Sequence, residues 1–282
     1  AGIGDSSSKV TKYDNPNRTL TDPYEGQQLG EIWGYVVDGY FKTDEEARNY
    51  KVDQSFVNQM INASALDNGL HAGDLKFVDL DGNNKIEQTT SANDRKDMKV
   101  IGNSLPRYNY NFGISADWYG IDFSVLFQGI GKQNWYPGAE TSMFWGPYSR
   151  PYASFIPSDF MSQVWSEENT DAYFPRPRGY VALGSNRELA VVNTKYLQNL
   201  AYCRLKNLSI GYTLPDKWLS KIGFEKIRVY FSGENLLTFT KLHSDYIDPE
   251  QASASNSWKT SKSDANIYPW AKTYSFGVDI TF

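Results

Sequence analysis

The chain has 282 residues and a formal net charge of −5, and its aromatic residues include 8 Trp, 20 Tyr and 15 Phe. The acidic balance argues against a nucleic-acid partner, because nucleic acids are bound by basic surfaces. No run of apolar residues approaches the roughly 18 that a membrane helix needs. The one cysteine, Cys203, excludes an internal disulfide, and two distant histidines without cysteine partners argue against a zinc site.

The first segments with a clear pattern lie before residue 60. The stretch GEIWGYVVDGYF (30–41) predicts a β-hairpin arm turned by its glycines. It is followed by TDEEARNY (43–50), which predicts a short helix capped by Thr43. We expect both elements to decorate loops rather than to form a core of their own.

The loop VDLDGNNKIE (78–87) has the spacing of a calcium-binding loop. Asp79, Asp81 and Asn83 stand at its first, third and fifth positions, where oxygen atoms would surround a hard cation. Thr90 stands at the twelfth position, where it cannot supply the usual bidentate carboxylate. The alternative is a solvated turn held by its aspartate side chains, and the departure at the twelfth position favours that alternative.

Five segments alternate apolar and polar residues with a period of two, which is the pattern of strands with one apolar and one polar face. The last of them runs through Tyr274, Phe276, Val278 and Ile280 to the aromatic Phe282. The predicted strands cover about 109–119, 121–131, 202–214, 226–237 and 271–282.

Two architectures fit these strands, a membrane barrel and a soluble β-sandwich. The polar face carries charged residues with glycines between them, which suits the water-filled lumen of a barrel; the charged residues are Asp117, Asp122, Arg228, Glu234 and Asp279. Strands of this length with aromatic residues near their ends also fit a tilted span of a bilayer. A soluble β-sandwich stays open as the alternative, although its inward face is usually dominated by Val, Ile and Leu.

The connections between the strands sharpen this choice. Tyr119-Gly120 and residues 215–225 are short, whereas residues 132–201 and 238–270 are long. Outer-membrane barrels have short turns on the periplasmic side and long loops outside. If the last strand runs toward the periplasm, both long loops and residues 1–108 lie outside. Five strands cannot close a barrel, so we expect the chain to be a piece of something larger.

The long loop 132–201 concentrates aromatic residues, and two roles are open to them. Exposed aromatic rings could stack on a ligand, whereas a loop of this length also needs a small core of its own or a partner that covers it. Packing is the interpretation that we favour for most of them, and PSDFMSQVW (157–165) predicts a second short helix, capped by Ser158. The ligand-binding candidates are Trp135, Tyr136, Phe144, Trp145 and Tyr148.

Several of these segments together resemble a known family. The runs KYLQNLAYCRLKNLSIGYTLP (195–215), RVYFSGENLLTFT (228–240) and YPWAKTYSFGVDITF (268–282) are similar to the C-terminal part of SusC/RagA-family TonB-dependent outer-membrane transporters. So is GDLKFVDLDGNNKIE (73–87). The resemblance implies an all-β fold, in which this chain contributes the last five strands of a barrel of about 22 strands that is filled by a plug.

The resemblance also implies a function and partners. Such a receptor imports glycans or peptides across the bacterial outer membrane, powered through TonB, with a SusD-like surface lipoprotein as its lid. The chain would then contact the lipid bilayer, the N-terminal remainder of the barrel and the plug. A passive or structural barrel and a soluble carbohydrate-binding β-domain are the alternatives. No catalytic set of residues stands out, so we expect no enzyme.

Two site assignments rest on the family pattern. Members often close the calcium-type loop with an Asp just before an Arg, and the matching Asp94 comes four residues late in this chain. We also expect Tyr274, Phe276 and Phe282 to form the signal that the outer-membrane assembly machinery recognises. In terms of domains, residues 1–108 form the extracellular loop region, and residues 109–282 hold the five strands and the two long outer loops.

Overall fold

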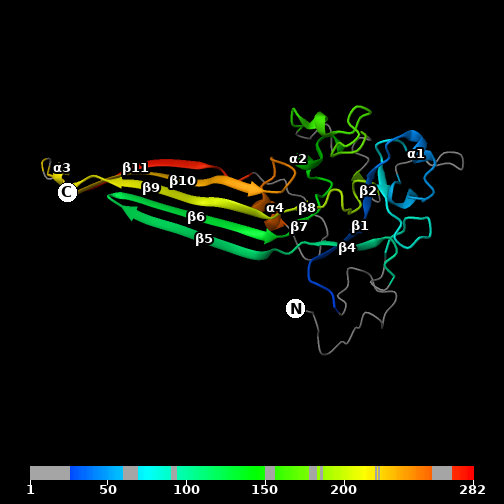
Figure 1. Ribbon diagram of the computed structural model, residues 1–282, viewed down its shortest axis with the longest axis horizontal. Coiled ribbons are helices and arrows are strands. Elements are labelled where there is room, and N and C mark those ends of the chain that lie inside the picture. The colour runs from blue at the N-terminus through cyan, green and yellow to red at the C-terminus, as the bar shows by residue number, and fades with distance from the viewer. Residues whose placement is uncertain are drawn as a thin grey trace.

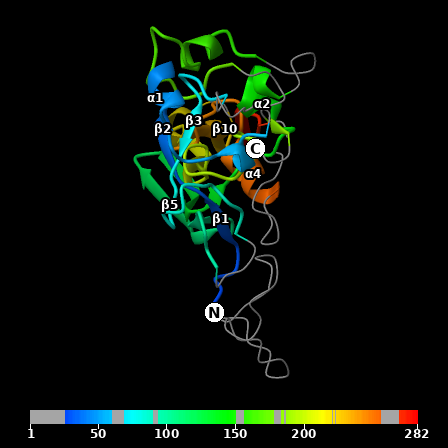
Figure 2. The ribbon, with the colours of Figure 1, turned by 90° about the vertical axis from the view of Figure 1, so that its right-hand side faces the viewer.

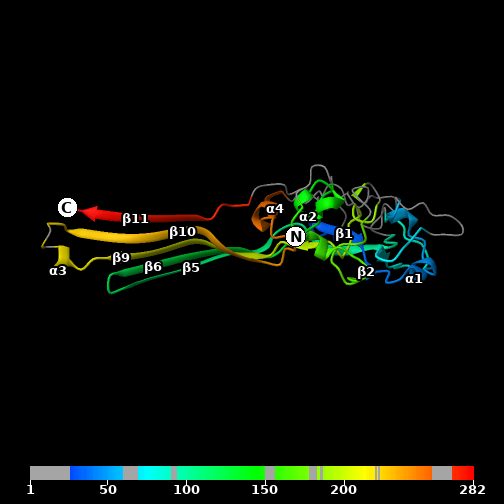
Figure 3. The same ribbon diagram turned by 90° about the horizontal axis from the view of Figure 1, so that it is seen from above.

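The computed structural model describes residues 26–59, 69–89, 94–149, 156–177, 183–184, 187–219, 221, 223–255 and 269–282. The molecule is elongated, with a long antiparallel sheet at one end and a mixture of loops, short strands and short helices at the other (Figure 1). We call the latter part the outer region, which comprises the described residues of 26–106, 133–201 and 241–255. Figure 3 shows the strands of the sheet running along the long axis, away from the outer region.

The sheet has five strands in the order β11-β10-β9-β6-β5, and all neighbours are antiparallel. Four strands begin and end within two residues of the ranges expected from the sequence, and β10 extends three residues further. The bounds are β5 Arg107–Trp118, β6 Ile121–Lys132, β9 Tyr202–Thr213, β10 Lys226–Thr240 and β11 Thr273–Thr281.

The longer β10 has a local cause. The pairing of β10 with β9 shifts between Glu234 and Leu237, and Asn235 lies in this bulge with a φ of 53°. A bulge inserts an extra residue into one strand and breaks the alternation of faces. The strand therefore loses its sequence pattern at the bulge but continues to pair as far as Thr240.

The two ends of the sheet differ as the connection lengths predict. Tyr119 and Gly120, with φ of 47° and 86°, form the tight turn between β5 and β6, and a side chain at position 120 would meet the Thr213 carbonyl oxygen. The short helix α3 (Asp216–Leu219) connects β9 to β10 at the same end, where the chain also ends (Figure 1). The long connections all enter the outer region.

The register divides the side chains of the sheet into two faces. One row across the five strands is made of serines, and the next row is made of apolar residues. The serine row lies on what we call the polar face, and the other row lies on the apolar face. The first row holds Ser115, Ser124, Ser209, Ser232 and Ser275, and the second holds Ala116, Phe123, Ile210, Phe231 and Phe276.

The predicted hairpin arm at 30–41 is wrong. Strand β1 (Glu31–Tyr35) pairs with β4 (Met98–Asn103), and strand β2 (Val37–Tyr40) pairs with β3 (Leu75–Phe77), so β1 and β2 do not pair with each other. The positive-φ glycines are Gly30 and Gly39, which lie near the ends of the segment, while Gly34 within it has no positive φ. Without a turn in its middle, the segment runs on and each half pairs with a partner distant in sequence.

Of the two predicted helices, only the first is confirmed. Helix α1 (Asp44–Arg48) is capped by Thr43, whose hydroxyl accepts a hydrogen bond from the Glu46 backbone N–H. Residues 157–165 hold only the 3₁₀ turn η3 (Phe160–Gln163), and Ser158 does not cap it.

No helix in the described part of the chain is long and apolar enough to cross a membrane. The other elements are η1 Ser55–Val57, β7 Asn134–Trp135, α2 Ser142–Trp145, η2 Gly146–Tyr148, β8 Gln198–Asn199 and α4 Pro249–Ser255.

Candidate functional site

The apolar face of the sheet is continuous and exposed. Its rings contact each other across strands: Phe112 stacks on Phe127 with centroids 5.0 Å apart, and Phe231 lies 5.2 Å from Phe276. Phe276 nevertheless keeps 82% of its surface exposed, and Ile114 keeps 60%. An exposed apolar surface of this extent marks contact with a partner or a membrane.

The polar face holds an ion-pair cluster near the end that carries α3. The Arg228 guanidinium donates two hydrogen bonds to Asp122, at 2.8 and 2.6 Å, and one to Asp279 at 3.2 Å. Bidentate pairing of this kind fixes the guanidinium in place. Gly211 makes the cluster geometrically feasible, because a side chain there would collide with both Asp122 and Arg228.

Aromatic side chains gather at the same end of the sheet. Trp118, Tyr119 and Trp218 lie in or beside the two turns and are 60% exposed or more. The Phe282 ring is 81% exposed and contacts Phe224, with centroids 5.3 Å apart. Interfacial belts of membrane barrels have this composition.

The three residues of the expected assembly signal lie on one strand or just beyond it. Tyr274 and Phe276 project from β11 beside Phe231, and Phe282 follows the last residue of the strand. Among the described residues, β11 pairs only with β10, so its other edge has no strand partner. The assembly role of these residues stays a prediction.

A buried arginine anchors the loop after β10 to the polar face at the other end of the sheet. Arg204, only 2% exposed, donates to Asp248 at 2.5 Å, to Glu250 at 2.8 Å and to the Thr238 hydroxyl at 2.9 Å. Lys206 adds contacts to both oxygens of Glu250 at 3.2 and 3.0 Å. Asp248 also accepts from the backbone N–H groups of the first turn of α4, so the network fixes this helix against β9.

The five aromatic residues predicted as ligand contacts are instead core residues. Trp135, Tyr136, Phe144, Trp145 and Tyr148 are each between 0 and 2% exposed and belong to the main hydrophobic cluster of the outer region. Their faces are covered by other side chains, so a ligand cannot stack on them. The ligand-binding prediction therefore gives way to packing, because the loop builds its own interior.

Sequence reasoning missed the polar groups that organise this core. The Asn193 amide donates to the Tyr136 hydroxyl at 2.9 Å, and Tyr136 donates to the Leu189 carbonyl. Tyr40 and Tyr196 share a hydrogen bond of 2.9 Å. Burial raises the pKa of Tyr173 to about 12, although its hydrogen bond with Gln198 opposes this. Single asparagines and tyrosines in a long loop give no sequence signal of such contacts.

The calcium-type loop brings together a different set of carboxylates from the predicted one. Oxygen atoms of Asp79, Asp81 and Asp97 all lie within 4.8 Å of one another, and Asp94 is not in the group. Both oxygens of Asp79 accept backbone N–H groups of the loop, as do both oxygens of Asp97. The Asn83 side chain binds within the loop, to the backbone N–H of Lys85.

Asp97 is the member of this group that the sequence did not reveal. Its side chain is fully buried, and burial raises its pKa, with Asp81 and Asp79 adding to the rise and two backbone hydrogen bonds opposing it. A buried carboxylate beside two others is a donor set that suits a hard cation. Asp97 lies ten residues beyond the predicted loop, outside the usual twelve-residue spacing.

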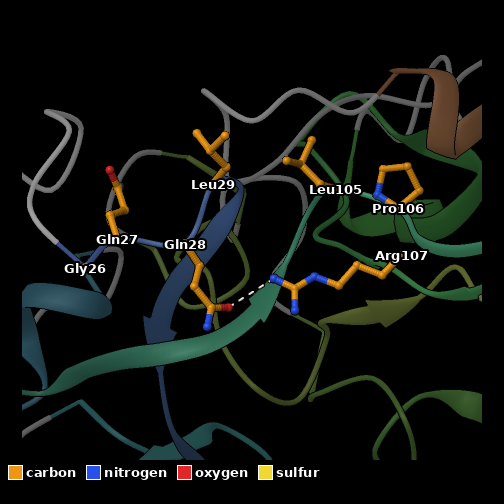
Figure 4. Close-up of a pocket in the computed structure, with 7 residues that line it drawn as sticks. All are labelled: Gly26, Gln27, Gln28, Leu29, Leu105, Pro106 and Arg107. Carbon is orange, nitrogen blue, oxygen red and sulfur yellow. Dashed lines mark hydrogen bonds between the residues drawn. The ribbon is translucent and has the colours of Figure 1, made fainter. Parts of the chain in front are cut away.

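A shallow pocket of about 560 Å³ lies where the chain passes from β4 into β5 (Figure 4). It is lined by residues 26–29 and 105–107, and Arg107 donates a hydrogen bond to the Gln28 amide oxygen at 3.1 Å. Its polar side chains are Gln27, Gln28 and Arg107, and two of these three already bind each other, so it offers few free groups to a ligand.

Comparison with known proteins gives a consistent result, although no protein-family model matches the chain. TonB-dependent receptor P3 of Formosa agariphila is 28% identical over 264 residues, which cover 92% of this chain and 22% of that receptor. TonB-dependent receptor P39 of the same organism is 26% identical over 283 residues, covering 92% of this chain and 25% of that receptor. The chain thus spans about a fifth to a quarter of the length of these relatives.

Solved structures show the same relationship at the level of the fold. The RagAB peptide importer in its 'open-open' state matches with a TM-score of 0.52 and 20% identity, over 96% of this chain and 24% of that one. The 'closed-closed' state matches with the same TM-score, 18% identity and 92% of this chain. The chain is therefore similar to part of TonB-dependent receptors and shares the fold of part of the RagAB importer, which confirms the resemblance to the SusC/RagA family expected from its sequence.

Proposed function

We propose that the chain forms part of the barrel wall and of the outer loops of a TonB-dependent outer-membrane importer of nutrients. The observation that carries this proposal is the sheet with one exposed apolar face and one polar face that holds buried and half-buried ion pairs. A barrel wall needs these two faces, because lipid covers its outside and water or protein fills its inside. The similarity to TonB-dependent receptors indicates a transporter rather than an enzyme.

The two edges of the sheet support a larger assembly. Within the described residues, β5 pairs only with β6 and β11 only with β10. Unpaired backbone groups inside a bilayer cost several kcal/mol each, so both edges would have to pair with further strands. The remainder of the receptor would supply those strands to complete a barrel of about 22, together with the plug and the segment that contacts TonB.

The partner on the outside would be a SusD-like lipoprotein. The RagAB match supports this, because that importer is a complex and the outer region is included in the aligned part. The cargo would be a glycan or a peptide. Co-purification of the full-length receptor with the lipoprotein encoded beside it tests the partner, and loss of every such contact in mild detergent would contradict it.

Uptake itself is tested in the organism that encodes the receptor. The complete gene should restore growth on the nutrient mixture that induces it, and removing TonB activity should abolish that growth. Growth that persists without TonB would favour the passive barrel, and recovery of the receptor in the aqueous phase without detergent would favour a soluble β-domain.

We also propose that Asp79, Asp81 and Asp97 hold a calcium ion. The positive charge of the ion would offset the negative charges of the three carboxylates. At a calcium concentration about one hundred times Kd, the ion should stabilise the outer region by about 2.7 kcal/mol. Thermal unfolding of the full-length receptor with calcium, with magnesium and with chelator measures this. Asp97→Asn should abolish the response, whereas Asp38→Asn, an acidic residue outside the group, should keep it.

A further inference from the structure

A second pocket lies on the polar face of the sheet, at the end that meets the outer region. Its volume is about 560 Å³, and helix α4 contributes Glu250 to its wall. Figure 1 shows α4 beside the ends of β9 and β10, and Figure 2, seen from the side of the outer region, shows α4 close to β10. Strands β5, β6 and β9 contribute Asn109, Asn111, Gln128 and Tyr202.

The register places these strand residues on one face. Asn111 is paired with Gln128, and Asn109 is paired with Ile130, which is in turn paired with Tyr202. They continue the rows of the polar face that begin with the serines, so the pocket opens on the same side of the sheet as the Arg228 cluster.

The uncharged polar groups of the pocket have hydrogen-bonding capacity to spare. In the part of the chain that the structure describes, the side chains of Asn109 and Asn111 make no hydrogen bond, and Gln128 bonds only to the Tyr202 hydroxyl. Each amide offers one acceptor oxygen and two donor hydrogens. A ligand whose groups both donate and accept, as hydroxyl groups do, matches this set.

The one charged residue found in the described lining of the pocket is already paired. Among the described residues, Glu250 is the only charged one that lines the pocket. Both of its oxygens accept hydrogen bonds from Lys206, and one of them also accepts from Arg204. Arg204 is itself shared with Asp248. A ligand with its own charges would find no free counter-charge among the described lining residues, and desolvating an unpaired charge is costly.

From these observations we propose that this pocket, with Asn109, Asn111 and Gln128 as its hydrogen-bonding groups, is a contact site for a neutral, hydroxyl-rich oligosaccharide. A free peptide fits it less well, because its two charged termini would lack partners there. The proposal rests on the importer function above, since only then does the polar face line the path of a cargo. Arg204 acts as a positioning residue, because it holds α4 and its Glu250 in place.

The test uses the full-length receptor, purified in detergent after its outer-membrane location has been established. The probes are a set of short neutral oligosaccharides built from glucose, mannose, galactose or xylose units, and a set of short peptides with free termini. Isothermal titration measures binding of each set. Asn111→Ala and Gln128→Ala should each weaken oligosaccharide binding about tenfold, the effect of losing one or two hydrogen bonds.

Asn207→Ala is the matched control, because Asn207 is an exposed amide on the same face but outside the pocket. Its affinity should equal that of the wild type. Equal affinity of all three variants, or no binding of any oligosaccharide in the set, would overturn the proposal. Peptide binding that depends on Asn111 and Gln128 would overturn the ligand class. A receptor that is absent from the outer membrane would instead contradict the importer function itself.

Discussion

The sheet and the outer region use the same kinds of residue in opposite ways. In the outer region Trp145 is fully buried and Phe144 is 2% exposed, whereas in the sheet Phe276 and Val278 keep 82% and 57% of their surfaces exposed. The outer region makes its own interior from aromatic rings. The apolar face of the sheet contributes to no core among the described residues, so its stability depends on what lies against it.

Polar groups show the same contrast. The outer region satisfies its buried tyrosines through backbone carbonyls, such as Tyr136 with Leu189 and Tyr148 with Pro175. The sheet instead arranges charges on one face, with Arg228 between two aspartates. The outer region thus resembles a soluble core, and the sheet resembles a wall between two media.

The largest effect should follow from removing the last strand. Deleting Tyr274–Phe282 would expose the edge of β10 and remove the aromatic end, so the receptor should fail to assemble and its surface display should be abolished. Surface proteolysis and heat-modifiable migration of the full-length receptor measure this. The control variant carries Thr273→Ser and Thr281→Ser in the same strand, and it should reach the surface normally. Undiminished display of the deletion variant would refute the assembly role of this strand.

In the outer region the corresponding test is Trp145→Ala. The indole is fully buried, lies 4.8 Å from the Phe144 ring and donates to the Gly138 carbonyl. Truncation should destabilise this region by about 3–5 kcal/mol through lost contacts and a cavity. Thermal unfolding combined with hydrogen exchange locates the loss. Met161→Ala, at a side chain that is 64% exposed, should change stability by no more than about 0.5 kcal/mol.

The sheet could be predicted closely because each strand repeats a local signal. Alternation places Ile210 and Ser209 on opposite faces whatever the strand pairs with, so the sequence alone was enough to assign the faces. The end of β10 was misplaced because the bulge at Asn235 interrupts that alternation. A bulge is a property of two paired strands, and one strand's sequence does not display it.

The outer region could be predicted much less well, and the reason is the distance between partners in the sequence. Strand β1 pairs with β4 across more than sixty residues, and Tyr35 forms a bridge to Asn193. Asp97 joins Asp79 and Asp81 only because the chain folds back. Local patterns found α1, whose cap lies one residue before the helix, but they did not reveal these long-range contacts.

Arginine substitutions on the two faces of the sheet test whether those faces meet different media. Ile210→Arg should cost about 2–4 kcal/mol if this position lies near the middle of a bilayer, and Ser209→Arg should cost much less. Reversible unfolding from liposomes measures both values, and the adjacent positions on one strand serve as controls for each other. Equal losses would mean that both faces meet the same medium, as in a soluble sheet.

The smallest effect concerns His243, where the loop after β10 meets the core of the outer region. Its ring stacks on Tyr173 with centroids 3.4 Å apart, and its Nε2 lies 2.8 Å from the Gln163 amide oxygen. Burial lowers the pKa of His243 below its ordinary value of 6.5, Lys195 lowers it further, and Asp245 opposes the shift.

The sign of the pH dependence follows from that lowered pKa. The folded state binds a proton at His243 less readily than the unfolded state does, so this contribution to stability is complete above pH 6.5 and is lost as the pH falls below that value. Protection factors from hydrogen exchange at residues 241–249, which correct each rate for its intrinsic pH dependence, should therefore be smaller in mildly acidic than in neutral buffer. His243→Phe keeps a ring for stacking but cannot titrate, so it should flatten this difference. An unchanged pH dependence in that variant would assign the effect to another group.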